Sequence, residues 1–353
     1  MIPVSVLRSA LIPLIAVTLA LVVGAILIAT SGSSPVEAYS ALIEGSFFGW
    51  ESFGTTLEKA TPLIMGGLAV AFAFKAGLFN IGGQGQLLFG ALIAGAVGYG
   101  FTGLPWIIHM PLALLLGAVA GAAWGAIPGI LKATRGAHEV ITTIMLNFVA
   151  ANMAEWLATK VWRKEGDILV RTPIIEDSAE IPTWGHVPLG FFIAVAFALA
   201  IWFLLQRTTF GFEIRSVGLN PSAAGYAGIS VKRIIVLTMT ISGFLAAIGG
   251  SIETLGVVGR YEPGVNAGLG FDGITIALLA RTHPIAVIPA AILIAAMNAS
   301  ASLMQFKAGV APEIVDVIEA LILLFVATPI IVRWFVKSRQ DDGVSVGATW
   351  GST

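Results

Sequence analysis

A glycine-rich stretch with three side-chain amides interrupts the apolar first third of the chain. It covers residues 79–86 and reads FNIGGQGQ, opening on Phe79 and carrying Asn80, Gln84 and Gln86. Primary amides donate and accept hydrogen bonds without carrying charge, so they suit an uncharged polar solute. We therefore interpret Phe79, Asn80, Gln84 and Gln86 as candidates for lining a substrate path.

Two interpretations of this stretch are open from the residues alone. Its glycines weaken a continuous helix, and a broken helix at membrane depth can direct free backbone N–H groups at a substrate when protein or a water-filled cavity covers it. Alternatively, the stretch is an ordinary tight turn at the cytosolic surface, which the nearby Lys75 favours.

A second polar pattern lies in the apolar run over 138–162. Thr143, Asn147, Ala151 and Glu155 recur every four residues and therefore share one face of a helix. Polar groups buried in lipid are costly and usually face the bundle interior or a water-filled path. We take Asn147 and Glu155 as further candidates for the path, with hydrogen bonding between helices as the alternative. That alternative is preferred for three hydroxyls: Thr143, Thr238 and Ser242.

The sequence holds no pattern for catalysis, a metal or a cofactor. It lacks a G-x-x-x-x-G-K-[ST] loop for ATP and an H-E-x-x-H zinc motif, and it contains no cysteine. The literal G-x-G-x-x-G match at Gly268, Gly270 and Gly273 follows no predicted strand, which indicates packing or chance. With a net charge of −1, nothing indicates nucleic-acid binding. We expect no catalytic residue, metal site, cofactor or nucleic-acid partner.

The candidate residues belong to a chain with the composition of an integral membrane protein. Hydrophobic residues make up 57% of it and charged residues 11%, with a mean hydropathy of +0.93. A soluble domain carries about a quarter charged residues. We predict an all-α, polytopic membrane helix bundle of about ten transmembrane segments, over residues 10–29, 60–76, 87–100, 105–131, 138–162, 188–206, 234–258, 269–281, 284–306 and 313–332. The run over 269–281 is too short for a straight span of about 20 residues, so we expect it to be tilted or half-buried.

Basic residues predict the orientation of these segments, because cytoplasmic loops carry an excess of Lys and Arg. Residues 31–58 contain four glutamates and no basic residue, so they are expected outside, with a short interfacial helix within 38–53. The loop over 207–233 and the stretch over 333–339 are basic and are expected inside. Both termini are therefore predicted to be cytoplasmic. We expect one transmembrane domain over 1–338 and a disordered cytoplasmic tail over 339–353.

Close helix contacts are predicted within this bundle. The chain contains 41 glycines, and Gly117, Gly121, Gly125 and Gly129 recur every four residues. This spacing places them on one helix face, where small residues let two helix backbones approach closely in lipid.

The basic loop over 207–233 contains a compact helix signal. Asn220 is a good N-cap, Pro221 fits the first helical position, and Gly228 is a suitable stop. A short helix held outside the bilayer between two spans is well placed to receive a push from a partner protein. The simpler alternative is a capped connecting loop.

Four stretches together resemble the membrane permease subunits of binding-protein-dependent ABC importers. They read FNIGGQGQLLFGALIAG, HEVITTIMLNFVA, RSVGLNPSAAGYAGISVKR and GFDGITIALLARTHPIAVIPAAIL. The wider family serves branched-chain amino acids and simple sugars. The greatest similarity is to nucleoside permeases that work with basic-membrane-protein-type lipoprotein receptors. The resemblance covers roughly residues 55–335, and its motifs are specific in combination rather than singly.

The resemblance implies an importer of several subunits in a prokaryotic cell membrane. This chain would pair with a second, related permease as a heterodimer, with two cytosolic ABC ATPases and with an external substrate-binding lipoprotein. It would translocate a nucleoside or a related simple sugar by alternating access, with no chemistry of its own. The 79–86 stretch would lie near the path. The 215–233 stretch would dock on the ATPase, with these coupling residues: Arg215, Gly218, Asn220, Ala223, Ala224, Ala227 and Gly228.

Two other function classes are alternatives to the importer. A secondary transporter driven by an ion gradient would need intramembrane carboxylates, for which Glu155, Glu253 and Asp272 are candidates. The lack of a paired basic or acidic relay deep in the bundle weighs against it. A membrane enzyme would need a clustered acidic metal site. Three acidic residues recur every three positions, but at the outer end of the last span, where a solvated helix start is the simpler interpretation: Glu313, Asp316 and Glu319.

Overall fold

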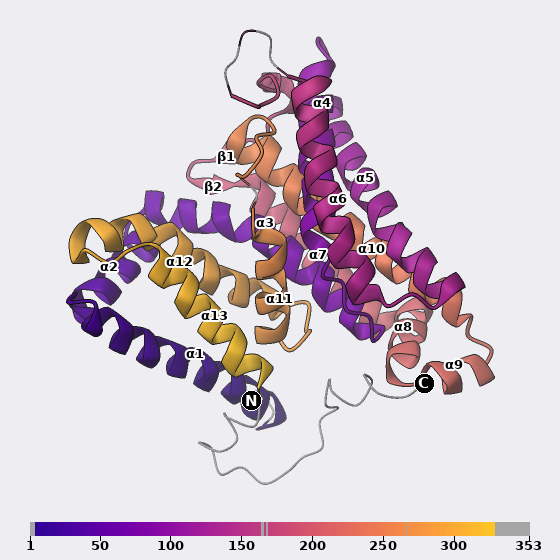
Figure 1. Cartoon of the computed structure of the whole chain (residues 1–353), viewed down its shortest axis with the longest axis horizontal. Coiled ribbons are helices and arrows are strands. Elements are labelled where there is room, and N and C mark those ends of the chain that lie inside the picture. Colours follow the sequence, from indigo (N-terminus) through magenta and orange to yellow (C-terminus); the bar gives the residue numbers. More distant parts are fainter. Residues whose placement is uncertain (1–3, 164–165, 167–168, 266, 329–353) are drawn as a thin grey trace.

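A computed structural model describes residues 4–163, 166, 169–265 and 267–328 (Figure 1). Almost all of its regular structure is helical, as predicted, and the one small hairpin pairs β1 (Thr183–Trp184) with β2 (Val187–Pro188). The helices are α1 (Val4–Thr30), α2 (Pro35–Phe47), α3 (Trp50–Lys75), α4 (Gly83–Gly100), α5 (Trp106–Arg135), α6 (Glu139–Lys160), α7 (Leu189–Arg207), α8 (Thr209–Leu219), α9 (Pro221–Tyr226), α10 (Val231–Glu253), α11 (Leu269–Leu279), α12 (Val287–Ala308) and α13 (Glu313–Ala327). A 3₁₀ turn (Asp177–Ala179) follows α6, and a π-helical turn (Thr254–Val258) extends α10.

Within the part of the chain that the structure describes, seven helices are long and apolar enough to cross a membrane: α1, α3, α5, α6, α7, α10 with its π-helical turn, and α12. The prediction of an all-α membrane bundle is therefore confirmed. The other three predicted segments fall on α4, α11 and α13, which are shorter or less apolar within the described residues. The predicted disordered tail over 339–353 lies outside the described residues.

The start of α3 differs from the sequence-based expectation. A separate interfacial helix was expected within 38–53, and the next span was expected to begin near residue 60. The expected short helix is present as α2, which ends at Phe47, but α3 begins at Trp50 rather than near residue 60, so Glu51 and Glu58 belong to a membrane-length helix. Glu51, Glu58 and Lys59 interrupt the apolar run, so hydropathy alone does not identify the first turns of α3 as part of the helix.

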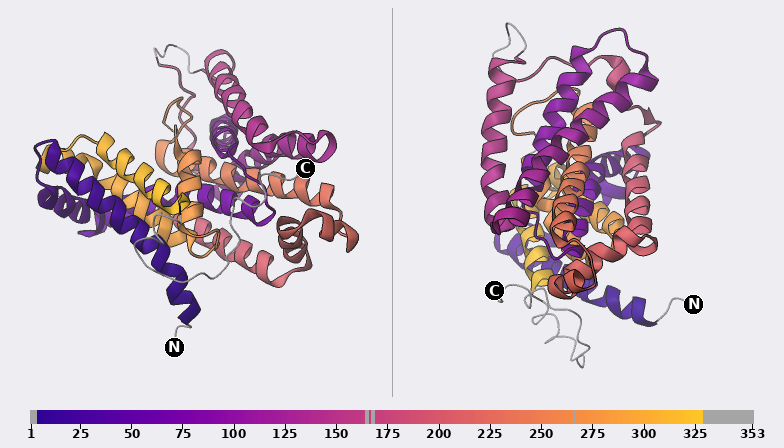
Figure 2. Two further views of the ribbon diagram at one scale, coloured as in Figure 1. Left: turned by 60° about the horizontal axis from the view of Figure 1, so that its bottom comes forward. Right: turned by 90° about the vertical axis from the view of Figure 1, so that its right-hand side faces the viewer.

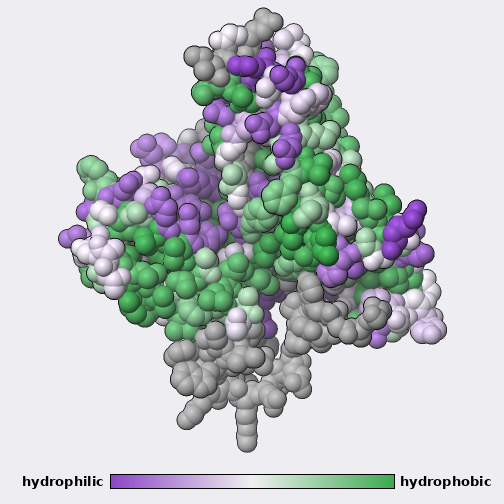
Figure 3. All heavy atoms as spheres, in the orientation of Figure 1, coloured by the Kyte–Doolittle hydropathy of each residue, from purple (hydrophilic) through white to green (hydrophobic). Residues whose placement is uncertain are grey.

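The helices form two groups with α3 and α11 between them (Figure 1). One group contains α4, α5, α6 and α10, and the other contains α1, α2, α12 and α13; further views of the same arrangement are in Figure 2. The enclosed position of α3 leaves its side chains from Ala60 to Ala73 buried. Apolar side chains cover the visible surface along α1 and α13 and over α5 and α6, as Figure 3 shows. That outer cover suits contact with lipid.

The glycines of α5 face α4 and α10 at almost no separation, which confirms the predicted stripe. A Cβ atom at Gly121 would overlap the Cβ of Ala247 and lie 2.9 Å from the carbonyl oxygens of Gln86 and Gly243. A Cβ atom at Gly117 would overlap the hydroxyl of Ser251 in the same way. Glycines of α4 and α10 also pack against the backbone of a neighbouring helix at this crossing: Gly90, Gly243 and Gly250.

Adding one methyl group at this crossing should destabilise the protein. Gly121→Ala forces α5 away from α10, and such overpacking costs about 1–3 kcal/mol. Gly100→Ala is the matched control, because no atom lies within 4 Å of a Cβ atom there. We expect the Gly121→Ala protein to unfold at a lower temperature in detergent, while the Gly100→Ala protein unfolds at or above the wild-type temperature. Equal melting of the two variants would contradict the proposed contact.

Candidate functional site

The chain leaves helical geometry between α3 and α4, in a segment that is largely but not wholly buried within the protein. The left-handed Gly77 (φ 70°) turns the chain after α3, and α4 begins at Gly83. Between them Leu78 and Asn80 are buried, with 2% and 1% of their surface exposed. Most of the 79–86 stretch is therefore covered by protein, whereas Gly77 just before it is exposed. We refer to residues 76–82 as the interhelix segment.

Asn80 anchors the interhelix segment to two helices. Its Nδ2 donates to Gln86 Oε1 and to the Ser242 hydroxyl on α10, both at 2.8 Å. Its Oδ1 accepts from the backbone N–H of Gly82 at 3.0 Å and from Gln86 Nε2 at 3.2 Å. Ser242 in turn donates to the carbonyl of Ala69 on α3 at 2.7 Å. An amide has two N–H donors and two acceptor sites on its oxygen, so the hydrogen-bonding capacity of Asn80 is filled by protein.

Asn147 on α6 holds the same segment from the opposite side. Its Oδ1 accepts the backbone N–H of Gly85 at 2.8 Å, and its Nδ2 donates to the carbonyl of Ile81 at 2.9 Å. Gly85 lies in the first turn of α4, whose N–H groups have no intrahelical acceptor, so Asn147 acts as a cap supplied by another helix. One turn earlier on α6, the side chain of Thr143 lies against Gly82.

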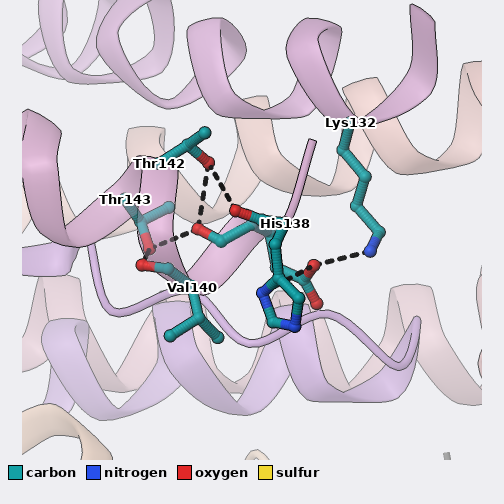
Figure 4. Close-up of polar contacts among 6 residues, drawn as sticks. Lys132, His138, Val140, Thr142 and Thr143 are labelled. Atoms are coloured by element: carbon teal, nitrogen blue, oxygen red, sulfur yellow. Dashed lines mark hydrogen bonds and ion pairs between the residues drawn. The ribbon is translucent and has the colours of Figure 1, made fainter. Parts of the chain in front are cut away.

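Local polar contacts fix the first turn of α6 in place (Figure 4). Lys132, in the last turn of α5, pairs with the carboxylate of Glu139 at 2.5 Å. Thr142 and Thr143 donate to backbone carbonyls of the preceding turn, at distances of 2.7–3.2 Å. Thr143 therefore bonds within its own helix rather than to a neighbouring one. These contacts set the position of α6 and, with it, that of Asn147.

Gln84 joins the beginnings of two helices. Its Oε1 accepts the backbone N–H of Gly270 at 2.8 Å, so the first turn of α4 and the first turn of α11 are in direct contact. A Cβ atom at Gly270 would overlap the backbone of Gln84, and one at Gly273 would lie 2.7 Å from the backbone of Gly66 on α3. The G-x-G-x-x-G match is thus a helix-packing feature. Because helix N-termini carry partial positive charge, an uncharged acceptor such as Gln84 suits this junction.

The structure brings together Asn80, Gln84, Gln86 and Asn147 but not Glu155. Glu155 lies two turns beyond Asn147 on an exposed part of α6, close to Tyr261. Burial raises the pKa of the Tyr261 phenol to about 12, and the Glu155 carboxylate adds to that shift. Phe79 is half-buried, with its ring 4.9 Å from that of Phe74.

The carboxylates named for an ion-coupled site are also dispersed. Glu253 lies near Glu58 and Lys59, whereas Asp272 is hydrogen-bonded to Glu319 of α13 and lies near Asp316. Among the described residues, no group of three or more His, Cys, Asp or Glu side chains is placed to hold a metal ion.

The loop between α7 and α10 forms two short capped helices, α8 and α9. The Asn220 side chain accepts from the backbone N–H of Ala223 at 3.0 Å, Pro221 is the first residue of α9, and Gly228 is left-handed at φ 85°. The predicted N-cap and stop are both confirmed. Arg215 ties α8 to the end of α7 through a 2.5 Å bond to the carbonyl of Leu205.

The outward face of this loop differs from the expected one. Ala224 was expected among the small residues that face a partner, but it is only 4% exposed and packs against its own chain. A substitution such as Ala224→Trp would therefore disturb the loop's own packing. Ala223, Ala227 and Gly228 are exposed, as expected. Two large apolar residues that the sequence analysis did not select are also exposed: Leu219 at 70% and Tyr226 at 95%. A six-residue helix is too short for a periodic pattern, so no sequence signal separates its faces.

Removing the Asn147 amide should loosen the interhelix segment. Asn147→Leu leaves the Gly85 N–H and the Ile81 carbonyl unpaired, and each buried unpaired group costs about 1–3 kcal/mol. Asn152→Leu is the matched control, because Asn152 is exposed and bonds only to the Phe148 carbonyl of its own helix. We expect a lower thermal midpoint in detergent for the first variant only. If both variants melt together, the two hydrogen bonds do not hold the segment.

Comparison with known proteins gives a consistent identification. Residues 52–327 match the family described as the permease component of branched-chain amino acid transport systems. The guanosine ABC transporter permease protein NupP of Bacillus subtilis is 42% identical, over 95% of this chain and 98% of its own length. The nucleoside ABC transporter permease protein NupB of Lactococcus lactis is 36% identical, over 92% and 93%. The glucose ABC transporter permease protein TsgB13 of Haloferax volcanii is 33% identical, over 90% and 86%.

The match spans both the buried interhelix segment and the exposed α8–α9 loop. ABC transporter permeases are transport subunits rather than enzymes, in keeping with the absence of an ATP-binding loop motif from this sequence. The chain belongs to the family of branched-chain amino acid transport system permease components, and its similarity to nucleoside ABC transporter permeases extends over more than nine-tenths of its length.

Proposed function

We propose that this chain is the membrane-spanning subunit of an ABC importer that carries nucleosides, or a related simple sugar, into the cell. The observation that carries the proposal is the 42% identity with a guanosine permease across 95% of the chain. Transport proceeds by alternating access, driven by ATP hydrolysis in a separate subunit. The fold supports this division of labour, because a buried break in the helices lies beside a loop whose tip is exposed.

The proposed topology has ten membrane segments in a prokaryotic cell membrane, with both termini in the cytoplasm. Its main support is the positive-inside rule. The basic α8–α9 loop lies at the same end of the bundle as the end of α3, where the Lys75 ammonium is within electrostatic range of Arg215. The helices on either side of this loop, α7 and α10, are both long enough to cross a membrane.

The importer has three kinds of partner in this proposal. Cytosolic ABC ATPase subunits bind the α8–α9 loop, a second related permease completes the path as a heterodimer, and an external lipoprotein delivers the solute. The coupling residues lie on α8, on α9 and on the residues that flank α9, with Ala224 and Gly218 acting inside the loop rather than on its surface. Exposed Tyr226 and Leu219 extend the ATPase-facing surface.

The substrate is an uncharged polar solute in this proposal. The amides of Asn80, Gln84, Gln86 and Asn147 place neutral groups at the junction of α4, α6 and α11. No Lys or Arg that would favour an anion is among the buried residues that the structure describes. Since these amides already bond to protein, they shape the wall of the path rather than grip the solute. Phe79 and Glu155 lie at its margins, and the second permease supplies the opposite wall.

Uptake measurements test the proposed function directly. The chain is expressed with its ATPase, second permease and receptor in cells lacking nucleoside uptake, and entry of labelled guanosine is followed. We expect uptake that stops on ATP depletion and survives collapse of ion gradients, and that Asn147→Leu abolishes while the protein still inserts. Uptake that follows the ion gradient instead would identify a secondary transporter.

The isolated chain should hydrolyse no ATP, because it has no phosphate-binding loop motif. We expect it to co-purify with the cytosolic ATPase when the two are expressed together, and hydrolysis to appear only in that complex. ATP hydrolysis by the purified chain, free of other subunits, would rule out a separate motor.

Truncating Tyr226 should weaken the contact with the ATPase. Its side chain is 95% exposed at the tip of the loop, and large aromatic residues at the centre of an interface commonly contribute about 2 kcal/mol or more. We expect Tyr226→Ala to lower ATPase co-purification by about tenfold or more. Trp184→Ala is the control, since Trp184 is 83% exposed on the β-hairpin, away from this loop. Equal ATPase recovery from both variants would remove Tyr226 from the interface.

A further inference from the structure

Gly218 brings α8 into backbone contact with the end of α3. A Cβ atom at Gly218 would overlap the carbonyl oxygen of Lys75, and would lie 2.9 Å from the Lys75 carbonyl carbon and 3.0 Å from that of Ala76. From the other side, a Cβ atom at Gly77 would lie 3.3 Å from the carbonyl oxygen of Gly218 and 3.4 Å from its Cα. The two backbones therefore touch with no side chain between them.

The contact falls where α3 passes into the interhelix segment. Three hydrogen bonds make this corner compact: Ala76 N–H to the Ala73 carbonyl, Gly77 N–H to Phe74, and Leu78 N–H to Ala73, at 3.0–3.1 Å. Two residues further on, Asn80 is fixed to α4 and α10 through its amide. Residues 78–82 therefore link Gly77 to the first turn of α4, and Leu78, Asn80 and Gly82 among them are buried.

The other side of the contact is equally firm. Ile214 and Val217 of α8 are buried, with 0% and 1% exposure, and Arg215 bonds to the carbonyl of Leu205 and the side chain of Gln206. Asn220 both ends α8 and caps α9, so no flexible linker separates Gly218 from the exposed tip. The helices α8 and α9 are therefore joined directly, and we expect a displacement of α9 to move α8 with it.

We propose that Gly218 is a positioning residue that transmits displacement of the α8–α9 loop to the interhelix segment, and thereby changes how the first turns of α4 and α11 meet. This inference rests on the proposed function, because it needs an ATPase to displace the loop. A contact between two backbones has no rotamer through which to absorb a shift, and packed contacts of this kind switch between arrangements rather than deform. Gly218 in this role contacts its own chain and not the ATPase.

The test uses the complete transporter with Gly218→Ala, which separates α8 from α3 by one methyl group. We expect the variant to assemble with the ATPase and to hydrolyse ATP near the wild-type rate, but to lose uptake by about tenfold, as expected for a residue on a coupling route. Gly100→Ala adds the same methyl group in open space and should transport normally. Parallel loss of assembly, hydrolysis and uptake in a Gly218→Ala protein that still folds would overturn the proposal, because it would indicate a structural role alone.

A reporter of the segment's movement separates transmission from simple packing. The chain has no cysteine, so Ile81→Cys provides a single thiol in the interhelix segment. In the otherwise wild-type complex we expect its maleimide labelling rate to change when ATP is added, and in the Gly218→Ala background we expect no change. A nucleotide-dependent rate that persists with Gly218→Ala would overturn the proposal.

Gly77→Ala approaches the same contact from the other side and keeps the proposal testable if Gly218→Ala does not fold. Its matched control is Gly136→Ala, because Gly136 has nearly the same left-handed φ of 67° but no atom within 4 Å of a Cβ. We expect only Gly77→Ala to uncouple hydrolysis from uptake. If the wild-type complex itself imports no nucleoside, the proposed function fails. If it does and both glycine variants import at the wild-type rate, this inference alone fails.

Discussion

Contact between helix backbones with no side chain at the crossing is the constraint on which this structure depends. In lipid, helices gain little from hiding apolar surface, so close packing has to supply their association. Gly90 of α4, the stripe of α5 and Gly243 and Gly250 of α10 remove the atoms that would keep these three helices apart. Their close approach fixes where α4 begins, and so where the amides of its first turn lie.

The break between α3 and α4 is tolerated because other helices supply the hydrogen bonds that it loses. Asn80, Asn147, Gln84 and Ser242 reach from four helices or their junctions to backbone and side-chain groups around one turn. An unpaired polar group buried in protein is costly, so the loss of one of these hydrogen bonds would also affect the groups bonded to it. Substitution at one of them is therefore expected to change the conformation of the junction more than the preference for one solute.

Periodic patterns and local caps were predictable from the sequence, whereas pairings between distant elements were not. The Gly117–Gly129 spacing and the Asn220–Pro221 start are local, and both agree with the structure. The position of Glu155 away from the interhelix segment, the bonded state of Asn80 and the burial of Ala224 depend on which helix packs where. The early start of α3 was missed because charged residues interrupt its apolar run. In that part of α3 only Gly54, Thr56 and Leu57 are buried, so few apolar core positions indicate it in the sequence.

We propose that contact between backbones at glycine serves packing in one place and motion in another. At the α4–α5–α10 crossing, the glycine contacts join three long helices at several points, so a local displacement there would have to move whole helices. At Gly218 and Gly77, the contact joins a helix of 11 residues to a chain corner that leaves helical geometry. A short element hinged beside a non-helical corner can shift as a body, while the glycine core behind it stays fixed. In this proposal, the glycines of α4, α5 and α10 hold a fixed frame, and the contact at Gly218 and Gly77 lets the α8–α9 loop move against it.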